Sequence, residues 1–331
     1  MSTPESTLRF GLIGCGRISQ VHLQCLSKDP QAKLVAVADV DAKATASTAE
    51  AFGVKGFQDA QKMVTEMNLD AVIICSPPNS HHALSDLALN SGVHVLCEKP
   101  LSLSVAEAET TIGVAKQKQR VLMMASKFRY VQDIIRAKNI MESGILGEVI
   151  LVENEFCSRV DMKNRWNAKY DVAGGGVLID NGSHSVDIIR YLVGPIRDLQ
   201  AIHGKKWQQL EVEDTCQLFV RCADGTMASI DLSWSIHKEN PFFIHVYGTA
   251  GTLEIGWKNG RYRQSEKLDW VNFGSGYDKF QAVGSQLRNF IQTIRGEDRP
   301  LITPEDAIES VRVVQSAYRS ASHNQWEKVT G

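Results

Sequence analysis

Short apolar runs alternate with amphipathic segments along residues 1–127. The runs have the length of β-strands, and the segments between them place apolar residues at the spacing of an α-helix. Strands separated by helices of about ten to fifteen residues are typical of a parallel sheet with helices on both faces. The expected strands lie at 8–13, 33–39, 55–57, 70–76, 94–97 and 121–125. We therefore predict an α/β domain with a doubly wound parallel sheet over residues 1–127.

From residue 128 onward the strand-like runs become longer and fewer helices separate them. Alternating runs lie at 148–156, 214–222, 226–235, 242–247 and 252–257, and helical patterns at 131–142, 174–192, 280–295 and 305–322. Asp224-Gly225 and Asn259-Gly260 are typical of hairpin turns. This pattern predicts an α+β domain over residues 128–331 with a large, mostly antiparallel sheet. A sheet face without helices would be a dimer surface, so we expect a homodimer or homotetramer.

A glycine-rich turn follows the first strand. Its residues are Gly14, Cys15, Gly16, Arg17 and Ile18. Gly14 would allow a tight turn, and Gly16 would let the backbone approach a pyrophosphate facing the first N–H groups of the next helix. Asp39 follows Gly16 by 23 residues, close to the roughly 20 expected of an acid that bonds the ribose hydroxyls. This order predicts a dinucleotide site, although Ser19 stands where glycine or alanine is usual. An ordinary turn of an unrelated α/β protein is the alternative.

Asp39 also indicates which dinucleotide is bound. A carboxylate accepts hydrogen bonds from a free ribose 2′-hydroxyl, whereas it repels a 2′-phosphate. The next residues, Val40 and Asp41, bring no cation, and Lys43 is expected inside the following helix. We therefore expect NAD to be preferred over NADP.

The composition is that of a globular protein. Of 331 residues, 43% are hydrophobic and 22% charged, and the net charge is −2. No block of like charges is present, so we expect neither nucleic acid nor membrane as a partner. No apolar run approaches the ~20 residues that span a bilayer, and the first ten residues do not resemble a signal peptide. Seven cysteines without a C-x-x-C pair suit a reducing compartment. We expect a cytoplasmic protein.

Two polar groups follow apolar strands at the ends where parallel sheets bind ligands. The first contains Ser76, Pro77, Pro78, Asn79, His81 and His82, and the second contains Glu98, Lys99 and Pro100. The first group is equally consistent with a proline-stiffened loop. Charged groups are costly to bury unless they are paired, so Glu98 and Lys99 indicate a function unless they form an exposed pair. A cis bond before Pro100 would be a credible way to aim the Lys99 amine.

A third cluster lies in the predicted C-terminal domain, where the triplet 174–176 consists of glycines. The triplet permits the close approach of a ligand or of another segment. Asp180 and His184 follow it, and their spacing of four places them on one face of a helix. An imidazole held beside a carboxylate is a suitable general acid or base. Considered alone, Asp180 is better explained as a helix cap and His184 as a hydrogen-bonded interior histidine.

Other chemistries have less support in the sequence. The nine histidines include no H-E-x-x-H, and no Cys/His set has zinc spacing, so we expect no metal. No G-x-S-x-G nucleophile motif is present. Arg165, Trp166 and Asn167 follow the strand at 148–156 and could line a sugar pocket, because an indole packs against the apolar face of a ring. A tryptophan that docks this loop on the core is the alternative.

Together these motifs resemble the Gfo/Idh/MocA family, named for glucose–fructose oxidoreductase and inositol dehydrogenase. The resemblance covers nearly the whole chain and rests on Gly14-x-Gly16, Asp39, Ser76-Pro77-Pro78-Asn79-x-x-His82, Glu98-Lys99-Pro100 and Gly174-Gly175-Gly176 through Asp180-x-Gly182-x-His184-x-x-Asp187. It implies an N-terminal Rossmann domain and a C-terminal sheet domain that forms dimers, often paired into tetramers. It also implies an NAD(P)-dependent oxidoreductase that acts on CH–OH groups of sugars, inositols or nucleotide sugars.

The resemblance further implies that Lys99, Asp180 and His184 are catalytic. His184 would take the proton of a secondary carbinol, Asp180 would orient the imidazole, and Lys99 would stabilise charge on the carbinol oxygen. The cofactor would contact Gly14, Gly16, Arg17, Ile18, Asp39, Ser76, Pro77, Asn79, His82, Glu98 and Lys99. The substrate would contact Lys99, Arg165, Trp166, Asp180 and His184.

Two other functions are compatible with the same resemblance. A glycosidase that retains NAD would oxidise and re-reduce the sugar within one cycle and release free sugar without net NADH. A non-enzymatic sensor would bind the nucleotide and contact a partner protein. Such a sensor would have no need to keep Lys99, Asp180 and His184 together.

Overall fold

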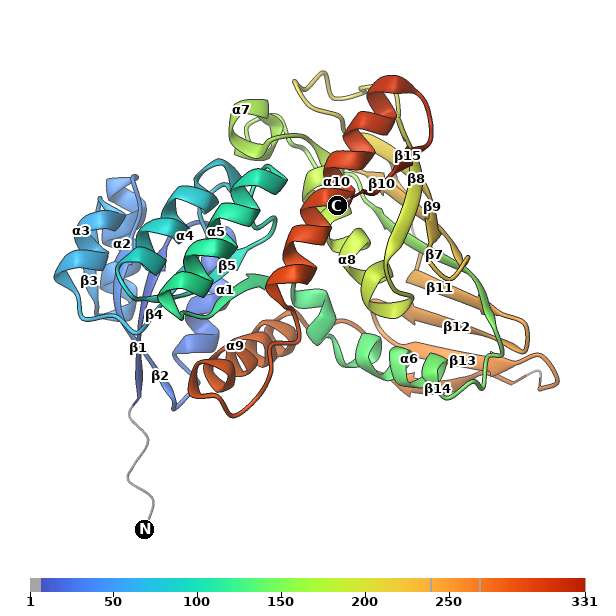
Figure 1. The fold of residues 1–331 in the computed structure, drawn as a ribbon, viewed down its shortest axis with the longest axis horizontal. Coiled ribbons are helices and arrows are strands. Elements are labelled where there is room, and N and C mark those ends of the chain that lie inside the picture. Colours follow the sequence, from blue (N-terminus) through green and yellow to red (C-terminus); the bar gives the residue numbers. More distant parts are fainter. Residues whose placement is uncertain (1–6, 239, 268, 331) are drawn as a thin grey trace, which may run out of the picture. The chain divides into compact units, whose positions relative to one another are not determined.

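The computed structural model describes residues 7–238, 240–267 and 269–330, and it divides into two compact units (Figure 1). Unit 1 comprises residues 1–127 and 280–308, and unit 2 comprises residues 128–279 and 309–331. Residues 280–308, expected in the C-terminal domain, thus pack in unit 1, whereas the functional division at residue 127 stays a prediction. Residues 1–6, where a signal peptide would begin, lie outside the described part. None of the described helices is both long and apolar enough to cross a bilayer.

Unit 1 is built on a six-stranded parallel sheet in the order β3-β2-β1-β4-β5-β6, which confirms the expected doubly wound fold. The strands are β1 (Leu8–Ile13), β2 (Ala32–Ala38), β3 (Lys55–Phe57), β4 (Ala71–Ile74), β5 (His94–Glu98) and β6 (Leu122–Ala125). The helices are α1 (Arg17–Leu26), α2 (Ala42–Phe52), α3 (Ala60–Glu66), α4 (His81–Asn90), α5 (Val105–Lys118) and α9 (Lys279–Arg295), with a 3₁₀ turn η1 (Pro78–Ser80). The strand order reverses between β1 and β4, where open sheets of this kind bind nucleotides.

Local sequence signals explain where the helices of unit 1 begin and end. The side chains of Asp41 and Asp59 accept backbone N–H bonds at the starts of α2 and α3. Ser104 and Glu107 form the expected capping box of α5. Gly53 ends α2 in the left-handed region, at a φ of 64°. These boundaries depend on neighbouring residues alone, which is why the sequence predicts them well.

Helix α9 joins unit 1 through aromatic packing. The fully buried rings of Phe10 on β1 and Phe290 on α9 meet edge to face, with their centroids 6.3 Å apart. An aromatic pair of this geometry adds about 0.5–1.5 kcal/mol to the gain from burial alone. A segment distant in sequence therefore completes the core of the first unit.

Unit 2 contains a nine-stranded sheet in the order β14-β13-β12-β11-β7-β10-β9-β8-β15 (Figure 1). Its strands are β7 (Val149–Cys157), β8 (Ile196–His203), β9 (Thr215–Cys222), β10 (Met227–Ser233), β11 (Phe242–Gly248), β12 (Gly251–Gly256), β13 (Gly260–Gln264), β14 (Val271–Gly274) and β15 (Glu327–Lys328). The helical segments are η2 (Lys127–Tyr130), α6 (Gln132–Glu142), η3 (Trp166–Ala168), α7 (Tyr170–Ala173), η4 (Leu178–Gly182), α8 (Ser183–Leu192) and α10 (Pro304–His323). Among the described strands of this sheet, only β7 and β10 pair in parallel, which confirms the mostly antiparallel sheet.

Four strands of this sheet, β8, β13, β14 and β15, were not among the expected ones. In β8 the pairing with β9 shifts between Ile196 and Asp198, so the neighbours Asp198 and Leu199 are both buried. Such a bulge breaks the alternation on which strand recognition depends. The other three strands are short and lie at or near the sheet edges, where few side chains need to be apolar.

The two faces of the sheet in unit 2 differ. Helices α6 and α8 pack on one face, and Ser320 of α10 accepts a hydrogen bond from the N–H of Ala201 on β8, 3.0 Å long. Within the described residues, no helix covers the other face (Figure 1). That face exposes Phe219 and Met227 on β9 and β10, at 42% and 50%. It is the uncovered surface that the alternating sequence pattern predicts.

Candidate active site

The candidate cofactor residues gather along one edge of the sheet in unit 1. Ile13 pairs with both Ala38 and Ile74, and Ile74 pairs with Cys97. The carboxyl ends of β1, β2, β4 and β5 therefore lie in line. The ends of these strands and the turns that follow them carry Gly14, Gly16, Asp39, Ser76, Glu98 and Lys99. These residues meet at the edge where α/β sheets bind their ligands.

The two glycines of the first turn serve different purposes. Gly14 has a φ of +94°, and a side chain there would place its Cβ 2.5 Å from the backbone N of Ser76. A Cβ at Gly16 would meet no protein atom within 4 Å, so packing does not require glycine at that position. Ser19 is fully buried and donates a hydrogen bond to the carbonyl of Gly16, 2.6 Å long, so serine is accommodated at the third small position.

Asp39 has a structural role that the sequence does not reveal. Its Oδ2 accepts a hydrogen bond from the N–H of Cys15 (2.6 Å), and its Oδ1 accepts one from the N–H of Asp41 (2.9 Å). The carboxylate thus holds the glycine-rich turn against the end of β2. Burial raises the pKa of the Cys15 thiol to about 11, and the charge of Asp39 adds to this, so Cys15 is a protonated spacer.

The two histidines after the proline pair have separate partners. His81 is buried, with Nδ1 2.7 Å from the carbonyl oxygen of Pro100 and Nε2 2.8 Å from that of Ser76. Burial lowers its pKa, although both carbonyls raise it. His82 instead places Nδ1 2.8 Å from the hydroxyl of Thr111 on α5. His81, which was not among the expected cofactor contacts, therefore joins the loops after β4 and β5, while a cofactor contact of His82 stays a prediction.

Glu98 is paired beneath the Glu98-Lys99-Pro100 turn. Its Oε1 accepts a hydrogen bond from Nε2 of His22, a fully buried histidine on α1, at 2.9 Å. Burial alone would raise the pKa of Glu98, but His22 and the charges of Lys127 and Lys99 outweigh it and lower the pKa to about 2. The Lys99–Pro100 bond is cis. His22 belongs to no recognisable motif. The sequence does not reveal its role, because only folding brings α1 to β5.

This pairing predicts how stability depends on pH. A carboxyl whose pKa falls from 4.5 to about 2 on folding stabilises the fold above the unfolded-state value. That contribution declines as the pH falls from about 4.5 toward 2. We expect Glu98→Gln to reduce the free energy of unfolding by about 2–3 kcal/mol near pH 7, and by about half of that or less near pH 3. Urea unfolding at both pH values measures this, and an equal loss at both would contradict it.

In unit 2, Asp180 and His184 lie on one continuous helical segment. Asp180 belongs to the π-helical turn η4, which leads directly into α8, where His184 lies. Asp180 is therefore inside the helix and is not its cap. Nδ2 of Asn167 lies 3.4 Å from Oδ2 of Asp180. π-helical turns occur frequently at functional sites, which suits this position.

His184 lies against a group of aromatic rings. It is 7% exposed, and its ring meets that of Phe128 edge to face at 5.0 Å. Phe128 in turn stacks on Tyr277 at 5.1 Å. The neighbouring Arg129 forms a buried ion pair with Asp187, in which Nη2 lies 2.7 Å from Oδ1. This packing fixes the face of α8 that carries the histidine.

Arg165 and Trp166 lie in the loop that leads to Asn167. Trp166 is 43% exposed at the start of η3. Arg165 is half-buried at the start of η3. Substrate contact by both residues stays a prediction, and docking of the loop by Trp166 stays the alternative explanation.

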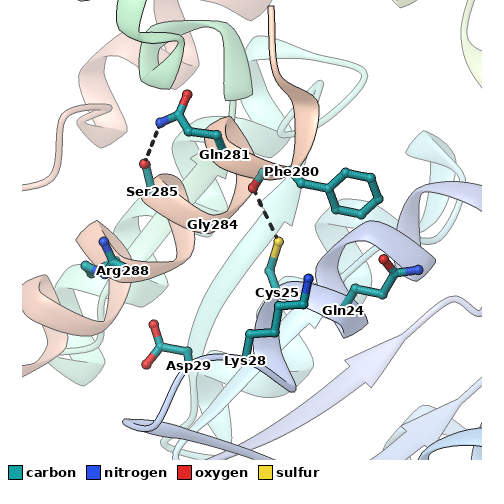
Figure 2. A pocket seen from close by; sticks show the side chains of 9 residues that line it. All are labelled: Gln24, Cys25, Lys28, Asp29, Phe280, Gln281, Gly284, Ser285 and Arg288. Atoms are coloured by element: carbon teal, nitrogen blue, oxygen red, sulfur yellow. Dashed lines mark hydrogen bonds between the residues drawn. The ribbon is translucent and has the colours of Figure 1, made fainter.

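A separate pocket of about 250 Å³ lies between α1 and α9, at the end of α1 opposite the glycine-rich turn (Figure 2). Some of its polar groups bond to one another: Cys25 Sγ lies 3.6 Å from the carbonyl oxygen of Phe280, and Gln281 donates to Ser285. Because it lies at the other end of α1, this pocket is not the candidate cofactor site.

Both halves of the chain match profiles of one protein family. Residues 8–126 match an oxidoreductase family with an NAD-binding Rossmann fold, and residues 134–254 match the Gfo/Idh/MocA C-terminal domain. The rhizopine catabolism protein MocA of Rhizobium meliloti is 27% identical over 314 residues, which are 93% of each chain. The myo-inositol 2-dehydrogenase of Thermotoga maritima is 26% identical over 328 residues, 95% of this chain and 96% of the relative.

Solved structures agree with this assignment. GenD2 from gentamicin A biosynthesis, in complex with NAD, is 25% identical with a TM-score of 0.89, over 100% of this chain and 98% of that one. Levoglucosan dehydrogenase in complex with NADH has the same fold. It is 21% identical, with a TM-score of 0.89, and the match covers 98% of this chain and 99% of that one. The chain belongs to the Gfo/Idh/MocA family of oxidoreductases, and it is an NAD(P)-dependent dehydrogenase that acts on CH–OH groups.

Proposed function

We propose that this enzyme transfers hydride between NAD and a secondary carbinol of a sugar, an inositol or a nucleotide sugar. The observation that carries the proposal is the helical segment of unit 2, which holds Asp180 and His184 within five residues of each other around a π turn. Lys99 completes the proposed set from the sheet edge of unit 1. The match of both halves of the chain to one family supports the common role of these residues.

The sheet edge of unit 1 suits a dinucleotide. Gly16 is not required by protein packing, which leaves close approach of a ligand as the reason for a glycine there. Helix α1 begins without a side-chain cap, so its first N–H groups suit a pyrophosphate. We assign the cofactor contacts to Gly14, Gly16, Arg17, Ile18, Asp39, Ser76, Pro77, Asn79, His82, Glu98 and Lys99.

The mechanism assigns one task to each side chain. Nicotinamide, when bound, supplies the hydride acceptor. His184 takes the carbinol proton as general base. Because its Nδ1 is buried, we assign Nε2 as the atom that accepts the proton. Asp180 orients the imidazole and stabilises its cationic form. The ammonium of Lys99 stabilises negative charge as it develops on the carbinol oxygen.

The polar loop and the relatives support the proposed substrate class. Arg165 and the exposed Trp166 offer a hydrogen-bond donor and an apolar ring face, which suit a polyhydroxylated ring. Named relatives include D-apiose, levoglucosan and inositol dehydrogenases. An assay of NADH formation with NAD⁺ and a panel of inositols, aldoses and nucleotide sugars tests the proposal, which predicts turnover of at least one class.

NAD is the preferred cofactor in this proposal because Asp39 would repel a 2′-phosphate. We expect NADPH to bind at least about tenfold more weakly than NADH, a difference of ~1.4 kcal/mol. Asp39→Asn removes the charge and keeps one acceptor oxygen, so it should reduce the discrimination between the cofactors; it can retain the bond from the N–H of Cys15 and loses the bond from the N–H of Asp41. Fluorescence titration of the unmodified enzyme and of Asp39→Asn with NADH and NADPH measures the discrimination. Equal affinities of the unmodified enzyme for NADH and NADPH would refute the preference.

The uncovered sheet face of unit 2 is the proposed surface between subunits. Phe219 and Met227 lie on neighbouring strands of this face and are exposed. Apolar side chains on an otherwise uncovered sheet suit a symmetric contact with a second copy. We expect a dimer or tetramer in light scattering, and a smaller species after Phe219→Asp combined with Met227→Asp. A monomer before substitution would contradict this assignment.

A further inference from the structure

The glycine triplet that precedes Asp180 lies against another segment of unit 2. A Cβ at Gly176 would overlap the backbone of Glu213, and a Cβ at Gly175 would overlap the hydroxyl of Tyr318. Glycine at these two positions is therefore required by the close approach of Glu213 and Tyr318. Of the two explanations that the sequence leaves open, ligand or protein segment, the structure shows the second at these positions.

Glu213 satisfies the first backbone donors of the helical segment. Its carboxylate accepts hydrogen bonds from the N–H of Gly176, at 3.0 and 3.1 Å from its two oxygens, and from the N–H of Leu178, at 3.0 Å. Its main-chain oxygen accepts the N–H of Val177 at 2.9 Å. No side chain at the start of η4 provides a cap of its own. A residue that lies just before β9 thus acts as the cap of the helix that carries Asp180 and His184.

The carboxylate is itself firmly held. Glu213 is 5% exposed, and its Oε1 also accepts a hydrogen bond from the hydroxyl of Tyr318 at 2.9 Å. Burial and the charge of Glu213 raise the pKa of Tyr318 well above its usual range, so the phenol stays a donor. The adjoining Asp214 is anchored to the sheet, because its carbonyl accepts the N–H of Trp234 at 2.8 Å. A negative charge at the start of a helix is also favoured by the helix dipole.

We propose that Glu213, held by Tyr318, is a positioning residue that fixes the π turn of Asp180 and thereby the orientation of His184. The N–H of Asp180 bonds to the carbonyl of Gly176 at 3.0 Å, so the backbone that Glu213 holds is the backbone from which the turn starts. The catalytic consequence rests on the proposed function, whereas the structural consequence does not.

Asp214 provides a matched control. It is an equally buried neighbouring carboxylate, and it also accepts three hydrogen bonds, from the N–H groups of Trp207 and Gln208 and from the hydroxyl of Ser235. None of these donors belongs to the segment 174–184. Asp214→Asn therefore reports the general effect of neutralising a buried carboxylate at this end of β9.

The test uses the full chain without substrate. Glu213→Gln should increase amide hydrogen exchange at Gly176 and Leu178 by about tenfold or more, because their charged acceptor is replaced by a neutral one. It should also shift the ring NMR signals of His184, which are assigned by their loss in His184→Asn. Tyr318→Phe, which preserves the packing of the ring, should change both readouts in the same direction and less. Asp214→Asn should change neither.

If amide exchange became faster in Glu213→Gln but the ring NMR signals of His184 did not change, Glu213 would only stabilise the fold. That result would overturn the proposal. Equal shifts in Asp214→Asn would overturn it as well. With any substrate that the enzyme turns over, Glu213→Gln should lower kcat about tenfold and leave the Kd for NADH unchanged. An absence of turnover in the unmodified enzyme would refute the proposed function and leave the exchange and NMR results to decide the role of Glu213.

Discussion

Replacing His184 with asparagine is expected to lower kcat by about 10²–10⁴-fold, the usual contribution of a positioned general base. Asparagine fits the space between α8 and Phe128 and cannot take a proton at neutral pH. The Kd for NADH should not change, because all the assigned cofactor contacts belong to unit 1. Steady-state kinetics and a binding titration measure the two quantities separately.

His323 offers a control for this substitution. It is an exposed histidine at the end of α10, so His323→Asn should retain the kcat of the unmodified enzyme. If His184→Asn kept more than about half of the normal kcat, the general base would have to be another group. A parallel loss in kcat and in NADH binding would instead indicate a disturbed fold.

The largest expected effect on stability comes from Arg129. This guanidinium and the carboxylate of Asp187 are 4% and 0% exposed, with Nη2 at 2.7 Å and Nε at 2.9 Å from Oδ1. Arg129→Met leaves the Asp187 charge buried without its cation, which should reduce the free energy of unfolding by about 3–5 kcal/mol. Urea unfolding measures the loss. The double variant Arg129→Met/Asp187→Leu should recover a large part of it, since a buried ion pair is often replaceable by apolar groups.

An exposed ion pair provides the comparison. Nζ of Lys55 lies 3.1 Å from the carboxylate of Glu66, and both side chains are more than half exposed. Lys55→Met should change the free energy of unfolding by less than about 1 kcal/mol. If Arg129→Met had a similarly small effect, water or other groups would be compensating the charge of Asp187 and its burial would not control stability.

The features that the sequence predicts well are those determined by neighbouring residues. The strand–turn–helix around Gly14 and Gly16 follows from local periodicity and backbone geometry, and so does the capping box of Ser104. The same holds for the hairpin between β9 and β10 at Asp224-Gly225. In each of these cases the physical cause lies within a few residues of its effect.

What the sequence does not predict depends on contacts between distant segments. His22 and Glu98 are 76 residues apart, and only the folded sheet brings α1 to the end of β5. His81 and His82 are adjacent, so the motif alone does not say which ring turns toward the loops. Glu213 gives no signal of its own, because a buried carboxylate that caps a distant helix looks in sequence like any acid before a strand.

The central claim is that this chain oxidises a carbinol with NAD⁺ by means of Lys99. The most direct measurement is NADH formation by the purified enzyme with the panel of inositols, aldoses and nucleotide sugars, repeated with Lys99→Ala. We predict turnover with at least one class and a loss of about 10²-fold or more in the variant. No NADH with any substrate, despite tight NAD binding, would contradict the claim and favour a glycosidase that recycles NAD or a sensor. Unchanged turnover in Lys99→Ala would contradict the assigned role of Lys99.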